Sequence, residues 1–216
     1  MTTLAPKPLL RGSLHRWSLR VSILPVATLV SVSGALVGAT AAIVTSIYGA
    51  TMVGLFGVST VYHRSVWTSP RHELIMRRLD LSMIFLFIAG TYTPLAVFAL
   101  PPAAARGLLI VVWTGALVGV TARLFWPTLS PFLAVPIYLA LGWIIAFFLP
   151  ELLHRAGTAA LVLVLVGCAL YTVGGAMFAS RWPDPWPAKF GYHEFFHAAT
   201  VLAALCHHIA IWLTLF

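Results

Sequence analysis

Long apolar stretches, separated by short polar or proline-rich segments, run along almost the whole chain. A helix needs about 20 apolar residues to cross the hydrocarbon core of a bilayer. Prolines at Pro101-Pro102 and Pro150 mark ends of these stretches, because proline cannot continue a helix. The pattern predicts an all-α membrane protein, a bundle of seven transmembrane helices, at residues 21–44, 46–66, 79–100, 104–124, 131–149, 158–179 and 192–215.

The composition agrees with a protein embedded in the lipid bilayer. Hydrophobic residues make up 61% of the chain and charged residues 8%, whereas a soluble domain carries about 25% charged residues. One small globule cannot bury so much apolar surface, so most of it must face lipid. The first apolar stretch is longer than that of a signal peptide, and we therefore expect it to remain as the first span.

The basic residues predict how the helices are oriented. A net charge of +8 could indicate nucleic-acid binding, but the lysines and arginines lie between apolar runs, which indicates membrane orientation and no nucleic-acid partner. Eleven of these 13 residues fall on the side of the N-terminal segment, and Arg106 and Arg155 fall on the other. Because positive residues mark the cytoplasmic side, we predict a basic cytoplasmic segment at 1–20 and a seven-helix domain at 21–216. The basic residues of that segment are Lys7, Arg11, Arg16 and Arg20.

Ionisable and polar residues gather near the cytoplasmic ends of three predicted spans. Ser59 and His63, four residues apart at the end of the second span, share one helical face. Asp80 begins the third span, and His193 and His197 repeat the four-residue spacing at the start of the seventh. Ionisable groups inside a membrane are costly and usually functional. The predicted topology brings these side chains to a similar depth in one leaflet.

Three histidines from two spans are a plausible zinc site. Three neutral imidazoles and a water are a common ligand set of catalytic zinc, and the metal lowers the pKa of that water. We therefore predict zinc ligands at His63, His193 and His197. Asp80 is the natural partner of the water, and Ser59 could hold the attacking water or a substrate carbonyl. Any one histidine alone would be explained better by an interhelical hydrogen bond.

The segment 193–197 also reads as H-E-x-x-H, the zinc motif of metalloproteases. Such a protease needs a third ligand downstream, but no acidic residue follows Glu194, and Thr200 and Ala203 occupy the positions of the extended motif. We interpret Glu194 as a carboxylate that faces the positive end of the helix dipole. The remaining histidines are placed outside the site: His15, His72 and His154 as flanking surface residues, His207 as a packing or relay residue, and His208 without a role.

Several segments are similar to one known family. They are "STVYH" (59–63), "RRLD" and "IAGTYTP" (77–80 and 88–94), "YTVGG" (171–175) and "FGYHEFFHAATVLAALCHH" (190–208). In these segments the chain resembles the hemolysin III family, the bacterial branch of the progestin and adiponectin receptor superfamily. The short segment before the first predicted span, without the extension of the animal receptors, favours that branch.

The resemblance implies a multi-pass protein of the bacterial inner membrane with zinc near its cytoplasmic face, similar to receptors with ceramidase-like activity. By motif position, the resemblance also implies His63, His193 and His197 as ligands, Asp80 as the residue that holds the zinc water, and Ser59 as its neighbour. Relatives often have histidine directly after the aspartate, where this chain has Leu81, so local polarity and proton transfer can differ.

Two functions of different classes follow from these residues. The leading hypothesis is a zinc-dependent hydrolase that acts on an amide or ester bond of a membrane lipid. The alternative is a sensor of membrane state, or a receptor-like protein, in which zinc is structural. A cytolysin ranks last because no polar stripe runs along several helices, and an intramembrane metalloprotease also ranks below the two leading hypotheses. The lipid and the oligomeric state stay open.

Overall fold

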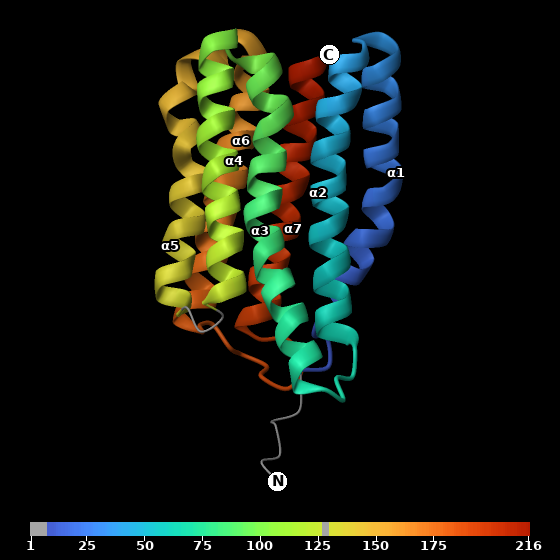
Figure 1. Ribbon diagram of the computed structural model, residues 1–216, viewed down its shortest axis with the longest axis vertical. Coiled ribbons are helices and arrows are strands. Elements are labelled where there is room, and N and C mark those ends of the chain that lie inside the picture. Colours follow the sequence, from blue (N-terminus) through green and yellow to red (C-terminus); the bar gives the residue numbers. More distant parts are fainter. Residues whose placement is uncertain (1–7, 127–129) are drawn as a thin grey trace.

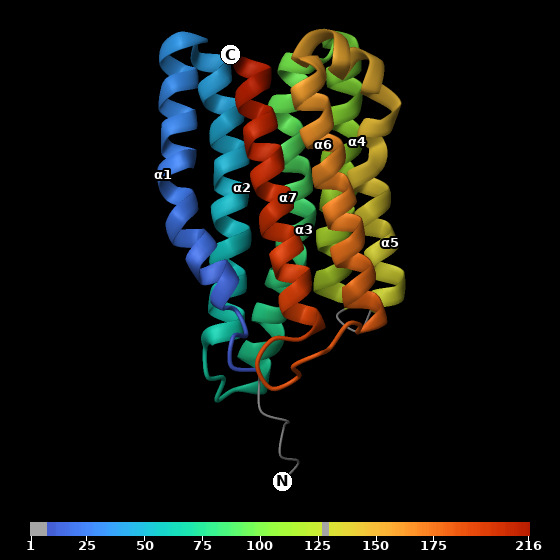
Figure 2. The ribbon, with the colours of Figure 1, turned by 180° about the vertical axis from the view of Figure 1, so that it is seen from behind.

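The computed structural model describes residues 8–126 and 130–216 as a bundle of helices. Figures 1 and 2 show the helices running roughly along the long axis of the molecule. No β-strand occurs in the described part of the chain, which confirms the all-α prediction. The helices are α1 (Ser13–Leu36), α2 (Ala39–Arg64), α3 (Pro70–Ala99), α4 (Pro102–Phe125), α5 (Pro131–Gly142), the 3-10 helix η1 (Trp143–Phe148), α6 (Leu149–Ser180) and α7 (Tyr192–Leu215).

Six helical segments of the described chain are long and apolar enough to cross a membrane. They are α1, α2, α3, α4, α7 and the stretch Phe132–Ser180. That stretch comprises most of α5, η1 and α6, and Figures 1 and 2 show α5 and α6 side by side. Inside α6, Gly157 has a left-handed φ of 80°, a conformation that glycine tolerates well. The separate fifth and sixth spans, and the cytoplasmic N-terminus, stay predictions.

Two predicted boundaries are wrong. The span expected at 21–44 runs across a turn, because α1 ends at Leu36 and α2 begins at Ala39. α1 begins at Ser13, so part of the expected N-terminal segment 1–20 is helical. Lys7 of that segment lies outside the described residues. A search for apolar runs misses the turn because Val37 and Gly38 interrupt the run with no polar residue, and it misses the start of α1 because that helix begins in polar sequence.

The third predicted span, 79–100, also begins too late. α3 starts at Pro70 and carries Glu73 in its first turn. Proline suits the first position of a helix, where its missing N–H is not needed, and an acidic residue there is favoured by the helix dipole. These local signals, and not hydropathy, determine where α3 begins.

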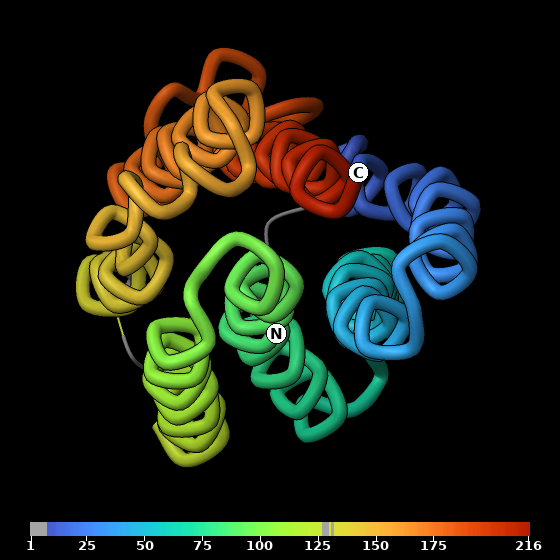
Figure 3. The backbone as a smooth tube through the Cα atoms, turned by 90° about the horizontal axis from the view of Figure 1, so that it is seen from above, coloured from blue at the N-terminus to red at the C-terminus, as the bar shows by residue number. Residues whose placement is uncertain are grey.

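α3 lies at the centre of the bundle. Seen from above, it lies inside the curve formed by the other helices, with its N-terminal end on the open side between α2 and α4 (Figure 3), and it packs against α2, α4, α5, α6 and α7. Small residues allow this close packing: Gly90 of α3 faces Thr51 of α2, and Gly119 of α4 faces Phe85 of α3. The arrangement places the start of α3 beside the end of α2 and the start of α7, which are the helices that carry the predicted ligands.

Candidate metal centre

Three histidine side chains meet where the end of α2 approaches the start of α7. Ligand atoms of His63, His193 and His197 all lie within 4.8 Å of one another, and these residues are the one such group in the described part of the chain. The Nε2 atoms of His63 and His193 are 3.3 Å apart. Bonds of about 2.0–2.1 Å in a tetrahedral zinc site separate two ligand atoms by about 3.3 Å. The donor set and the spacing of this pair fit zinc, whereas the wider pairs, within 4.8 Å, would have to draw together around an ion.

Helix geometry explains why these histidines converge. His193 and His197 lie one turn apart on one face of α7, and His63 is in the last turn of α2. His63 and His197 are buried, and His193 is half-buried. The ring of Phe178 packs edge-on against His193 at a centroid distance of 5.5 Å. Aromatic side chains of α6 and α7, Phe178 and Phe196, therefore pack around the ring of His193.

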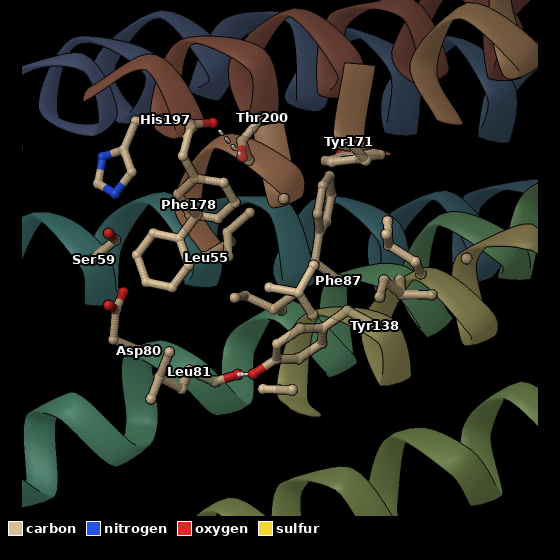
Figure 4. Close-up of a pocket in the computed structure, with 18 of the residues that line it drawn as sticks. Leu55, Ser59, Asp80, Leu81, Phe87, Tyr138, Tyr171, Phe178, His197 and Thr200 are labelled. Carbon is tan, nitrogen blue, oxygen red and sulfur yellow. Dashed lines mark hydrogen bonds between the residues drawn. The ribbon is translucent and has the colours of Figure 1, made fainter. Parts of the chain in front are cut away.

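Asp80 and Ser59 complete this end of the bundle. The Oδ2 atom of Asp80 is 3.6 Å from Nε2 of His63, which is longer than a hydrogen bond. Ser59 is 1% exposed and lies one turn before His63 on α2. In Figure 4 the side chains of Ser59, Asp80 and His197 gather at one end of a pocket. The structure thus brings together all five residues that sequence analysis selected.

Glu194 has a structural partner for each of its carboxylate oxygens. Nε of Arg11 donates to Oε1 at 2.6 Å, and the backbone N–H of Gly191 donates to Oε2 at 2.9 Å. The side chain is buried and caps the first turn of α7. These contacts agree with the interpretation of Glu194 as a carboxylate at a helix N-terminus, and they leave it poorly placed to act as a general base.

The prediction that His15 is a surface residue is wrong. Its side chain is 3% exposed, and its ring stacks on that of His197 with centroids 3.8 Å apart and planes 3° apart. The error follows from the misplaced start of α1, which put His15 outside the bundle. His72 and His154 are exposed, as predicted.

A cavity of about 400 Å³ extends from the histidines into the bundle, within the 300–1,000 Å³ range of ligand pockets. His63, Asp80 and His197 line it at one end, and apolar side chains such as Leu95 and Ile145 line its interior. It reaches His207, roughly 15 Å from His197 along α7 at 1.5 Å per residue. Figure 4 shows Phe87, Tyr138 and Tyr171 around this space.

The two deeper histidines make contacts that stabilise the bundle. Nε2 of His207 is 3.1 Å from the carbonyl oxygen of Val164 on α6, which agrees with a packing role. Nδ1 of His208 is 3.3 Å from the hydroxyl of Tyr48, and its Nε2 accepts a hydrogen bond from Trp212 at 3.1 Å. His208 therefore ties α7 to α2, a role that the sequence did not reveal.

Comparison with known proteins gives consistent matches. A family described as Haemolysin-III related matches residues 4–208. Hemolysin-3 of Bacillus cereus is 31% identical over 140 residues, which cover 65% of this chain and 63% of that protein. The Hemolysin-3 homolog of Bacillus subtilis (strain 168) is 32% identical over 129 residues, 60% of each chain. The matched region thus spans less than two thirds of either relative.

Proposed function

The chain belongs to the haemolysin-III related family, and from that premise we propose that it is a zinc-dependent hydrolase of a membrane lipid. The bond cleaved is an amide or an ester. The observation that carries the proposal is a set of three convergent histidines beside a carboxylate, at one end of an apolar cavity. In this arrangement the metal centre would face the polar group of a lipid whose hydrocarbon tail occupies the cavity.

The cavity suits an amphiphile. Its interior is lined by aliphatic and aromatic side chains, whereas Arg77 and Arg181 line the end near the histidines. Ligand pockets are mostly apolar with a few placed polar groups that fix orientation. A lipid would therefore place its hydrocarbon chain toward His207 and its polar group toward the metal centre.

The residues of the site can be assigned separate tasks. His63, His193 and His197 would hold zinc, which when bound polarises a carbonyl and activates water. Asp80 accepts the proton of the attacking water as the new C–O bond forms. It then returns that proton to the leaving nitrogen or oxygen as the C–N or C–O bond of the lipid breaks. Ser59 can donate a hydrogen bond that orients the water or the carbonyl.

A direct test combines metal analysis with lipid analysis. Purified protein should contain about one zinc per chain, as expected for a three-histidine site. Cells that express the protein should lose one class of amide-linked or ester-linked lipid and gain the corresponding free acid. Zinc without any change in the lipids would favour the sensor hypothesis, and protein without zinc would contradict the proposal.

We also propose seven crossings of the bacterial inner membrane, with the N-terminus in the cytoplasm. The distribution of 11 basic residues against 2 and the side-by-side arrangement of α5 and α6 support this topology (Figure 2). Reporter fusions after Lys189 and at Phe216 should then report opposite sides of the membrane. If both report the same side, α7 does not cross and the topology is wrong.

Glu194→Gln is expected to leave the zinc content and any hydrolysis at saturating zinc largely intact, because the backbone hydrogen bonds of Leu9 and Leu10 to Ala188 and Lys189 still hold the segment before α1. The substitution removes the charge that pairs with Arg11, so the melting temperature should fall while the metal ligands stay in place. Loss of a metalloprotease general base would instead cost about 10²–10⁴-fold in rate. Glu73→Gln, in the first turn of α3, is the control for removal of a helix N-terminal carboxylate. If Glu194→Gln loses activity while it retains zinc, and the control Glu73→Gln keeps its activity, the protease hypothesis is restored.

A further inference from the structure

The segment before α1 is bound to the loop that leads into α7. The backbone N–H groups of Leu9 and Leu10 donate to the carbonyl oxygens of Ala188 and Lys189, at 2.9 and 3.2 Å. Arg11 then forms its ion pair with Glu194. Figure 2 shows this blue segment beside the orange loop. We refer to residues 9–15 as the N-terminal strap.

Gly12 brings the strap directly against a predicted metal ligand. Its φ is 72°, in the left-handed region, and a Cβ at this position would lie 2.7 Å from Cβ of His63. A side chain is therefore disfavoured both by the backbone conformation and by the contact. The strap packs on the last turn of α2 while it is bonded to the start of α7, so it contacts both ligand-bearing helices.

His15, at the end of the strap, contacts the centre through the face of its ring. It stacks on His197 on one side, and its centroid is 5.2 Å from that of Phe56. No hydrogen-bond partner within the described chain reaches either of its ring nitrogens. An imidazole binds a metal through a lone pair in the plane of its ring. Two nearly parallel stacked rings cannot aim such lone pairs at the same ion, so His15 in this position is not a fourth ligand.

We propose that His15 is a positioning residue, which fixes the ring orientation of His197 and is itself held by the N-terminal strap. This inference rests on the metal centre proposed above and does not require hydrolysis. A ligand ring that can rotate must be ordered when the metal binds, which lowers affinity. Groups that orient metal ligands typically contribute 10–100-fold in metal affinity. The strap thereby makes the residues before α1 and its first turn part of the centre.

The inference is tested by zinc affinity, measured by chelator competition, and by the visible spectrum of the cobalt-substituted protein. His15→Ala removes the stacked ring, whereas His15→Phe keeps a flat ring and lacks the nitrogens. His15→Leu also lacks a flat ring but fills most of the volume of the histidine side chain. It therefore tests the same loss if His15→Ala fails to fold. Retained cooperative unfolding identifies the variants that can be compared, and His72→Ala, an exposed histidine on α3, is the control.

We expect His15→Ala and His15→Leu to bind zinc about 10–100-fold more weakly and to change the cobalt spectrum. His15→Phe should bind nearly as tightly as the wild type and keep its spectrum. Wild-type affinity in the alanine and leucine variants would overturn the positioning role. A phenylalanine variant as weak as the alanine variant would also overturn it, because a ring nitrogen would then be required. A wild type that binds no metal would instead contradict the metal centre itself.

Discussion

His197→Ala is expected to remove most of the bound zinc and all zinc-dependent hydrolysis. His197 is the most enclosed of the three predicted ligands, at 3% exposure, and its removal leaves two histidines. A two-histidine remnant is a poor zinc site, because protein zinc sites normally supply at least three side-chain ligands. Within the described residues, no other group of three ligating side chains is present that could hold the metal instead.

The matched control is His208→Ala, on the same helix. His208 is also buried, and its loss removes contacts to Tyr48 and Trp212, so the fold should be perturbed to a similar degree. Zinc per chain, measured by elemental analysis after gel filtration, should stay near the wild-type value in this control. Equal zinc content in the wild type and in His197→Ala would exclude the three-histidine site.

The location of the candidate site could be predicted because it depends on few physical quantities. Apolar length limits where each helix can cross, and the positive residues indicate which ends share a side. Together they brought Ser59, His63, Asp80, His193 and His197 to one depth before any contact was known. The structure places all five of these residues along the lining of one cavity.

The N-terminal strap could not be predicted in the same way. Its contacts are a pair of backbone hydrogen bonds, one ion pair and a stacked ring, and none of these leaves a hydrophobic period in the sequence. From the sequence, Arg11 is only one of the basic residues that predict orientation. In the structure it forms an ion pair with Glu194 at the start of α7.

Leu81 takes part in local packing through its backbone. Its side chain lines the cavity, and its carbonyl oxygen accepts a hydrogen bond from the hydroxyl of Tyr138 at 3.0 Å (Figure 4). Nε of Arg123 in turn donates to that hydroxyl at 3.0 Å. The tie between α3 and α5 uses the backbone at position 81, so it does not depend on which side chain is there.

Asp80→Asn is expected to separate a catalytic from a structural zinc. Three neutral imidazoles leave the charge of the metal uncompensated, and Asp80 is the nearest carboxylate, 3.6 Å from His63. Asparagine keeps the size of the side chain but removes both the charge and the proton acceptor. Loss of a general base costs about 10²–10⁴-fold in rate, whereas loss of a group that supports the ligands costs about 10–100-fold in metal affinity.

The decisive measurement compares lipid hydrolysis by the wild type and by Asp80→Asn, both confirmed to be loaded with zinc. The control is Asp184→Asn, the same change at an exposed site in the loop before α7, which should behave as the wild type. If the fold loss in the hydrolysis rate of zinc-loaded Asp80→Asn exceeds its fold loss in zinc affinity, the proton transfer is assigned to this carboxylate. Equal rates in the two loaded proteins would remove Asp80 from the reaction. If neither hydrolyses any amide-linked or ester-linked lipid while both retain zinc, the charge of Asp80 serves only to hold the metal, and the sensor hypothesis is favoured.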